Sequence, residues 1–204
     1  MAVAAGSDVG QAHLFDVNTG NLLRTFNDPT ATGGDQFGNA VALFGNRALI
    51  GARLDNTSGT SVGQAHLFDI NTGNLLHTFS DPTVTSTDNF GFSLALSGSH
   101  ALVGAREDNT AGTRVGQAHL FDVNTGSLVR TFDDPTVTGF DRFGNSVALS
   151  GNVALIGAIG DDTSGSNVGQ AHLFDVNTGT LLRTLNDPNP TSGDEFGRSV
   201  AIVG

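Results

Sequence analysis

The octapeptide Val-Gly-Gln-Ala-His-Leu-Phe-Asp at residues 115–122 decides the fold, because it occurs four times in this chain of 204 residues. Its copies begin at Val9, Val62, Val115 and Val168, with a constant spacing of 53 residues. An Asn-Thr-Gly turn, an Asp-Pro pair and an Asp-x-Phe-Gly motif follow each copy at the same spacing. Self-similarity at a fixed period indicates structural repeats that stack against one another.

Within one repeat, the apolar runs are short, rich in branched and aromatic residues, and separated by Gly, Asn, Asp and Pro. This pattern is typical of strands and turns, and in one repeat it predicts strands at 90–97, 101–105, 116–123 and 128–132. Two of the connections are tight and two are long and polar. A four-stranded antiparallel unit has two faces to bury, so radial stacking of the units predicts a β-propeller. A linear stack is the alternative.

We therefore expect an all-β chain in which residues 1–204 form a single propeller of four four-stranded antiparallel blades. The expected blades are 196–204 together with 1–26, then 37–79, 90–132 and 143–185. Pairing of Met1–Ala5 with Ser199–Val203 would close the ring, because Met1–Ala5 matches Ala48–Ala52 in the next repeat. We favour a closed monomer, and the same pairing between two chains would give an eight-bladed ring.

The composition excludes several classes of partner. The chain has 20 acidic residues, nine arginines and no lysine, for a net charge of −11, whereas nucleic-acid binding needs clustered positive charge. Cysteine is absent, which excludes disulfides and thiolate metal sites. No apolar run approaches the roughly 20 residues needed to cross a bilayer, so we expect no membrane insertion. The first nine residues lack the pattern of a signal peptide.

The stretch Phe143–Leu149, followed by Ala154–Ala158, resembles the FG-GAP repeat of integrin α-subunit propellers and of secreted bacterial proteins. The resemblance implies that the strand after Phe-Gly is innermost, and that the chain is an adhesion or interaction module. It also suggests a secreted or cell-surface location. Integrin repeats often carry a calcium loop between the first two strands, and here that link is Ser150–Asn152. Calcium is therefore not expected at that position.

Differences between the copies gather near the long connections, where a rigid scaffold usually presents its binding residues. A single asymmetric site there would use Phe92, Arg142, Arg198, Asn39 and Asn145. Because strand direction alternates, both long connections should emerge on the same face as the Asp-x-Phe-Gly motif.

Two sets of repeated polar residues invite a metal interpretation. Asp35, Asp88, Asp141 and Asp194 each precede an inner strand. Local turn hydrogen bonds are the favoured role for these aspartates, and a weakly bound cation on the axis is the alternative. His13, His66, His119 and His172 lie on third strands of different blades, too far apart to converge on one ion, so we expect them to pack between blades. No organic cofactor is expected.

The sequence thus predicts a non-catalytic interaction module with a protein or glycan ligand. One alternative is an architectural or engineered repeat without a ligand, since the copies are nearly identical. A lectin-like propeller with one repeated pocket is another. An enzyme ranks last, because blades this alike do not supply unlike catalytic residues.

Overall fold

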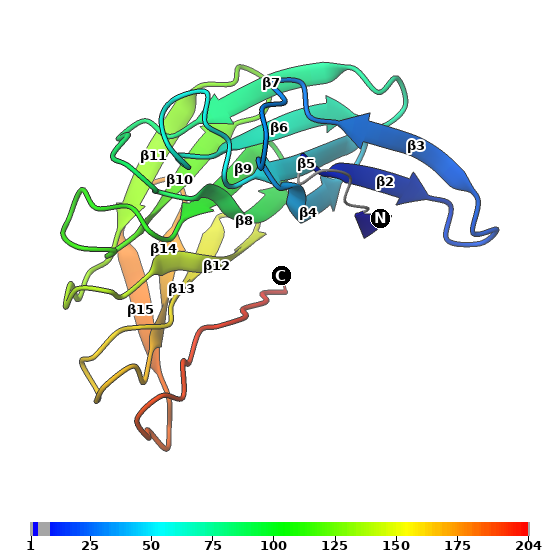
Figure 1. Ribbon diagram of the computed structural model, residues 1–204. Coiled ribbons are helices and arrows are strands. Elements are labelled where there is room, and N and C mark those ends of the chain that lie inside the picture. Colours follow the sequence, from blue (N-terminus) through cyan, green and yellow to red (C-terminus); the bar gives the residue numbers. More distant parts are fainter. Residues whose placement is uncertain (1, 4–8, 204) are drawn as a thin grey trace.

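The computed structural model describes residues 2–3 and 9–203, and these residues form strands and loops arranged in four antiparallel sheets (Figure 1). The first sheet contains β1 (Ala2–Val3), β2 (Gln11–Phe15) and β3 (Leu22–Asn27); the second contains β4 (Phe37–Phe44), β5 (Arg47–Ala52), β6 (Gln64–Asp69) and β7 (Leu75–Ser80). The third contains β8 (Phe90–Ser97), β9 (His100–Ala105), β10 (Gln117–Asp122) and β11 (Leu128–Asp133); the fourth contains β12 (Phe143–Ser150), β13 (Val153–Ala158), β14 (Gln170–Asp175) and β15 (Leu181–Asn186). The expected four-stranded antiparallel repeat is therefore confirmed in three consecutive sheets.

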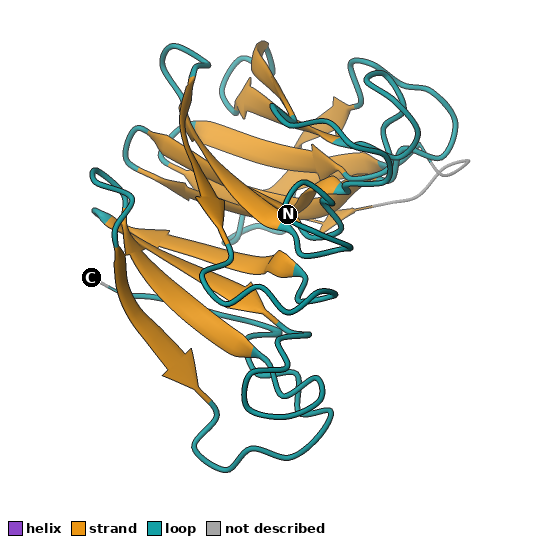
Figure 2. Ribbon diagram, turned by 90° about the vertical axis from the view of Figure 1, so that its left-hand side faces the viewer, coloured by secondary structure: helices purple, strands orange, loops and turns teal. Residues whose placement is uncertain are grey.

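The sheets follow one another along an arc, with β7, β11 and β15 on its outer side (Figure 1). Figure 2 shows the same sheets and their connecting loops from the side. Their first strands lie side by side, since β8 contacts both β4 and β12. In the part of the chain that the structure describes, no helix is long and apolar enough to span a membrane.

Apolar side chains fill the space between neighbouring sheets. The phenylalanines of three Phe-Gly motifs, Phe37, Phe90 and Phe143, are buried, and the Phe90 ring packs edge-on against Phe121 of the same sheet. Phe121 also stacks at 4.7 Å on Phe79, which comes from the preceding sheet. Fully burying one such side chain contributes about 1.5–3 kcal/mol. The repeats therefore depend on one another for their cores.

The Phe-Gly and Gly-Ala signatures have one shared cause, which is the close approach of two neighbouring sheets. A Cβ atom on Gly104 of β9 would lie 2.1 Å from the carbonyl oxygen of Gly144 on β12. Gly144 itself has a left-handed φ of 85°, which side chains with a Cβ rarely adopt. Both positions therefore require glycine for these two sheets to touch.

Arginine side chains on the outer strands also join neighbouring sheets. Arg24 on β3 donates hydrogen bonds to the carbonyl oxygens of Ile70, Asn71 and Thr72 in the next sheet. Arg130 on β11 donates to the carbonyl oxygen of Asn177 in the same way, at 2.9 Å. These contacts supplement the apolar cores near the tight turns.

Closure of the ring is not formed in the described residues. Phe196 starts like an inner strand, since its N–H donates to Val168 at 2.7 Å, just as Phe143 donates to Val115. The following residues 199–203 nevertheless form no strand, so the first sheet has three strands instead of four. A strand needs a hydrogen-bonded neighbour to satisfy its backbone, and residues 199–203 have none among the described residues.

The expected match of Met1–Ala5 to β5 is also altered by one residue. Residues 1, 4 and 5 lie outside the described residues. Ala2 lies opposite His13, whereas the expected alignment places Ala2 opposite Leu14. A shift by one residue exchanges the two faces of a strand. Closure therefore stays a prediction.

Candidate functional site

The long loops of successive repeats bond to one another and form one surface. The N–H of Arg142, just before β12, donates to the carbonyl oxygen of Arg114 at 3.1 Å. One repeat later, the N–H of Glu195 donates to the carbonyl oxygen of Asn167 in the same way. In the described part of the chain, nine residues other than glycine have left-handed φ angles, and all lie in these loops: Gln36, Ser61, Thr87, Asn89, Arg114, Phe140, Arg142, Asn167 and Glu195. Such a conformation costs about 1–2 kcal/mol per residue and persists where the surroundings enforce it.

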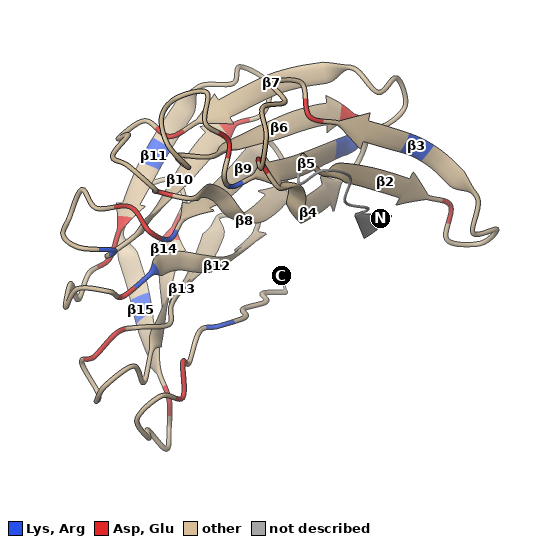
Figure 3. Cartoon of the chain, viewed as in Figure 1, with Lys and Arg blue, Asp and Glu red and all other residues tan. Residues whose placement is uncertain are grey.

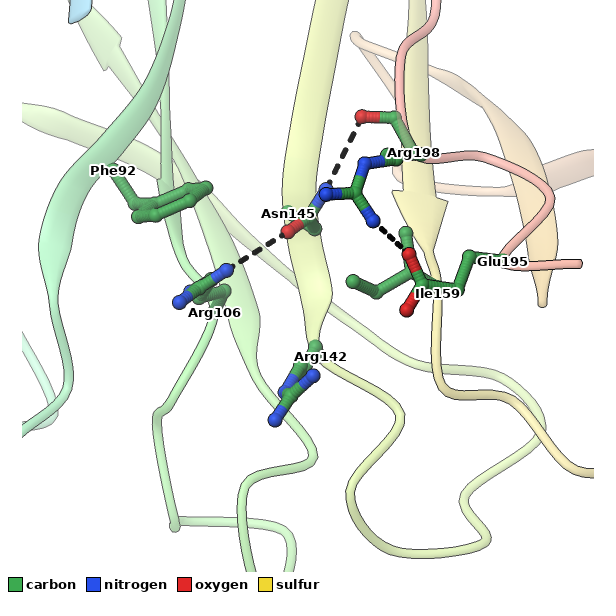
Figure 4. A pocket seen from close by; sticks show the side chains of 7 residues that line it. All are labelled: Phe92, Arg106, Arg142, Asn145, Ile159, Glu195 and Arg198. Carbon is green, nitrogen blue, oxygen red and sulfur yellow. Dashed lines mark hydrogen bonds and ion pairs between the residues drawn. The ribbon is translucent and has the colours of Figure 1, made fainter. Parts of the chain in front are cut away.

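A cavity of about 360 Å³ opens beside these loops (Figure 4). It is lined by Phe92, Arg106, Arg142, Asn145, Ile159, Glu195 and Arg198. These residues come from the third sheet, the fourth sheet and the segment after β15, so three consecutive repeats contribute to one asymmetric cavity.

The structure brings together four of the five residues expected at the binding site, namely Phe92, Arg142, Asn145 and Arg198. Asn39 does not line the cavity. Its Nδ2 donates to the carbonyl oxygens of Gly91 and Phe92, so it joins β4 to β8.

Sequence reasoning missed Arg106, Ile159 and Glu195. Sequence variation could have indicated two of these residues. Arg106 and Ile159 occupy the same position in successive repeats, and the residue type at this position changes between these two repeats. Glu195 likewise occupies a variable position, between Asp and Phe of the Asp-x-Phe-Gly motif.

Arg106 lies at the centre of the contacts in the cavity. Its guanidinium carbon is 3.8 Å from the ring centroid of Phe92, and Nη1 donates to Asn145 Oδ1 at 3.3 Å. Burial lowers the pKa of the Arg106 guanidinium, and the charges of Arg142 and Arg53 act in the same direction while Glu107 opposes them. Several arginine side chains thus lie close together at this site.

The carboxylate of Glu107 contacts two arginines of the cavity and one from a neighbouring loop. Glu107 lies within 3.6 Å of the Nε atoms of Arg106, Arg114 and Arg142. The Nε atoms of Arg106 and Arg142 are buried and have no hydrogen-bond partner among the described residues. Arg198 pairs with Glu195. The cavity therefore carries an excess of positive charge, although acidic loops surround it (Figure 3).

The four aspartates of the Asp-x-Phe-Gly motifs do not form one group of ligand atoms among the described residues, so nothing there supports the alternative of an axial cation. Asp35, Asp88 and Asp141 are buried, whereas Asp194 is exposed. Each accepts hydrogen bonds from a threonine three residues earlier, as Asp141 Oδ2 does from the Thr138 N–H at 2.7 Å. The turn role is the one that the geometry supports, because these short bonds direct each carboxylate into its own loop.

Three of the four repeated histidines lie in the interior, whereas His13 is half-buried. His66, His119 and His172 are fully buried, and each ring lies 5.7–5.9 Å from the phenylalanine of a Phe-Gly motif. Their Nδ1 atoms are hydrogen-bonded to threonine hydroxyl groups on the neighbouring strand. Burial lowers the pKa of His119 to about 3 and that of His66 and His172 to about 4. At neutral pH all three are uncharged.

Comparison with known proteins assigns the repeat. The model of the FG-GAP repeat matches residues 28–68, 80–121 and 137–174, which is more than half of the chain. No curated protein matches the chain. Each matched segment runs from the loop before an inner strand to the third strand of the same sheet, and so contains the Phe-Gly and Gly-Ala strands. Because these strands and loops also carry the cavity, the site is built on the repeat itself, and the chain belongs to the FG-GAP repeat family.

Proposed function

We propose that this chain is a non-catalytic interaction module whose arginine-lined cavity binds an acidic group of a protein ligand. The observation that carries the proposal is the convergence of Arg106, Arg142 and Arg198 on one cavity. FG-GAP repeats typically form binding or adhesion modules, which agrees with this assignment.

The chemistry of the cavity favours a carboxylate. Arginine binds carboxylates through two parallel hydrogen bonds, and such charge-assisted bonds are stronger than neutral ones. Because Glu107 already lies near the buried Nε atoms of Arg106 and Arg142, an added carboxylate would use the terminal nitrogen atoms of the guanidinium groups. Elsewhere the chain is strongly acidic, so an acidic ligand is repelled from other surfaces and directed to this one.

The backbone at Arg142 is strained, as it is at the equivalent positions Gln36, Asn89 and Glu195, so this strain is a property of the repeat. Arg142 has a φ of 55°, a conformation that glycine adopts without cost. Arg142 lines the cavity and Gln36 does not, so the two positions share the strain but differ in their access to a ligand. Arg142 is therefore the residue on which we base the test.

The lining residues also support a binding role over catalysis. Among them, the one carboxylate, Glu195, is held by Arg198, and the others are Arg, Asn, Phe and Ile. Nucleophilic and general acid–base catalysis use groups such as Ser, Cys, His or an unpaired carboxylate.

The test compares Arg142→Gly with Gln36→Gly. Gln36 occupies the equivalent position before β4, has the same φ of 55°, and does not line the cavity. Both variants relieve the same backbone strain, so both should be at least as stable as the parent chain. Binding of a fluorescent tetraglutamate peptide, measured by anisotropy, should weaken at least about tenfold in Arg142→Gly and stay unchanged in Gln36→Gly.

Equal peptide binding by the two variants would contradict the proposal. Absence of peptide binding by the parent chain at low salt would do the same, and would favour an architectural repeat. If a sulfated or uronic oligosaccharide binds and the peptide does not, the cavity is a glycan site, and the assignment to a protein ligand is wrong.

We also propose that Ser199–Val203 completes the first sheet and closes a propeller. The support comes from uncovered apolar side chains on β4. Val41 and Leu43 are 37% and 46% exposed, whereas the equivalent Leu94 and Leu96 pack in the core between sheets. An inner strand in the first sheet would cover Val41 and Leu43. We favour closure within one chain, with closure between two chains as the alternative.

Because the chain lacks cysteine, one engineered pair tests closure directly. In the observed register Ala2 corresponds to Ile50, which pairs with Val41, and Val41 corresponds to Val200. Oxidised Ala2→Cys with Val200→Cys should therefore form a disulfide, and the control pair Ala2→Cys with Ile202→Cys should not. A product of monomer mass supports closure within one chain, and a product of dimer mass supports the two-chain ring. Failure of the first pair to oxidise would contradict both.

A further inference from the structure

Three buried clusters of carboxylates lie beneath the long loops, one for each matched repeat. In the clearest of them, the carboxylate oxygens of Asp81, Asp88 and Asp108 lie within 4.8 Å of one another. The other two clusters are Asp28 with Asp35 and Asp55, and Asp134 with Asp161 and His172. All of these residues are buried.

The carboxylates of the second cluster lack a compensating charge among the described residues. The nearest basic side chain to Asp81 is His119, whose Nε2 lies 3.7 Å from Asp81 Oδ1, and no arginine forms an ion pair with the cluster among the described residues. Oδ2 of Asp81 and Oδ2 of Asp108 are buried and accept no hydrogen bond from the described residues. Burying carboxylates without a compensating charge costs several kcal/mol for each group.

His119 supplies an independent observation. Its side chain is fully buried, and Nδ1 is 3.0 Å from the hydroxyl of Thr131, which orients the ring. Nε2 lies 3.7 Å from Oδ1 of Asp81, a member of the cluster, and has no hydrogen-bond partner among the described residues. With the proton on Nδ1, Nε2 presents a lone pair to the carboxylates, which is the arrangement that metal-binding histidines adopt.

The separation of these two atoms suits a shared ion. A distance of 3.7 Å is too long for a hydrogen bond. Two ligand atoms at about 2.0–2.2 Å from one metal ion lie roughly 3–4 Å apart. His66 repeats the arrangement in the first cluster, where its Nε2 is 3.8 Å from Asp28 Oδ1 and is also unpartnered. In the third cluster Nε2 of His172 is likewise buried without a partner.

We propose that each of the three clusters binds one divalent metal ion through aspartate oxygens and the Nε2 atom of the repeated histidine. The mixed oxygen and nitrogen ligands favour Mn²⁺ or Zn²⁺ over Ca²⁺, which is held by oxygen atoms alone. In the second site the ligands come from the loop before β8, the loop after β9, and β10. Each ion therefore ties together the loops that carry the ligand-binding face.

The proposal is tested on the full chain after treatment with a chelator, with MnCl2, ZnCl2 and CaCl2 as separate probes. Isothermal titration and elemental analysis should give three Mn²⁺ or Zn²⁺ ions per chain. Metal at one hundred times its Kd should raise the melting temperature by at least about 5 °C. Electron paramagnetic resonance of bound Mn²⁺ should show coupling to nitrogen.

Asp108→Asn is the decisive variant, and Asp122→Asn is its matched control on an exposed turn. Asp108→Asn should bind two ions in place of three, whereas Asp122→Asn should still bind three. The metal-free melting temperature of Asp108→Asn should be equal to or above that of the parent chain, because one buried charge is removed. If the variant lost metal binding because it misfolds, its metal-free melting temperature would instead be lower than that of the parent chain.

Three outcomes would overturn the proposal. One is the absence of binding for all three ions at millimolar concentration, which would mean that protons neutralise the clusters. Another is unchanged stoichiometry in Asp108→Asn. Calcium binding without manganese or zinc binding would overturn the role of the histidine.

Discussion

Replacement of Gly104 by alanine tests whether the close approach of two sheets, rather than backbone flexibility, explains the Gly-Ala signature. Gly104 lies on β9 and does not have a left-handed φ, so alanine adds no backbone strain there. The added Cβ atom would lie 2.1 Å from the carbonyl oxygen of Gly144 and 2.3 Å from Ser93 Oγ. Because the first of these contacts is to backbone, no change of rotamer relieves it.

The cost follows from the distance that the sheets must move apart. A comfortable contact needs more than about 3 Å, so β12 must move by roughly 1 Å. Overpacking of this kind costs typically 1–3 kcal/mol and occasionally more, and we expect about 3 kcal/mol because the neighbouring atom belongs to backbone. For a chain of this length each kcal/mol lowers the melting temperature by about 2–4 °C. The expected decrease is therefore about 6–12 °C.

Thermal unfolding followed by circular dichroism measures this decrease. The control is Gly33→Ala, because a Cβ atom on Gly33 meets nothing within 4 Å and Gly33 does not have a left-handed φ. This control should change stability by less than about 1 kcal/mol, and in the stabilising direction. If Gly104→Ala melts within about 2 °C of the parent chain, the sheets are not in contact at Gly144 and the packing described here is wrong.

Two further predictions concern the outer strands and the tight turns. Arg130→Ala removes the hydrogen bond to the Asn177 carbonyl, so urea unfolding should show a loss of about 0.5–1.5 kcal/mol, and an unchanged unfolding free energy would contradict the role of this contact between sheets. At Asp122, hydrogen bonds led by the backbone N–H of Thr125 lower the pKa of the carboxyl group below its ordinary value of 3.8. Its charge therefore stabilises the fold above about pH 4, and this contribution is lost as the pH falls through the lower folded pKa. Asp122→Asn should accordingly melt below the parent chain at pH 6 and approach it near pH 2; a difference that is constant with pH would contradict this mechanism.

The candidate site shows how much of its lining could be predicted from differences between the repeats. Phe92, Arg142, Asn145 and Arg198 were predicted because these positions differ between nearly identical copies, and the cavity contains all four. Arg106 and Ile159 also differ between copies, yet they follow the second strand of their sheets. Their place in the cavity depends on how neighbouring sheets pack, which spacing along the chain does not describe.

The aspartates of the Asp-x-Phe-Gly motifs show what repetition along the chain did not predict. Their repetition before each inner strand suggested one ring around an axis, but Asp35 and Asp88 each join two other carboxylates from neighbouring loops. Asp81, Asp88 and Asp108 are separated by up to 27 residues, and they meet because two loops fold over one strand. Such a cluster is a product of tertiary contacts and has no local signature.

The sequence by itself determined the all-β class, the four-strand repeat, its tight turns and the face that carries the long loops. These features are local, because alternation of apolar residues and the backbone preferences of Gly, Asn and Asp operate within a few residues. The tertiary structure alone decided which arginines share a cavity, which aspartates share a cluster, and where the first sheet lacks an inner strand. These features depend on contacts between sheets, since the distance between two neighbouring repeats is set by close approaches such as that of Gly104 to Gly144.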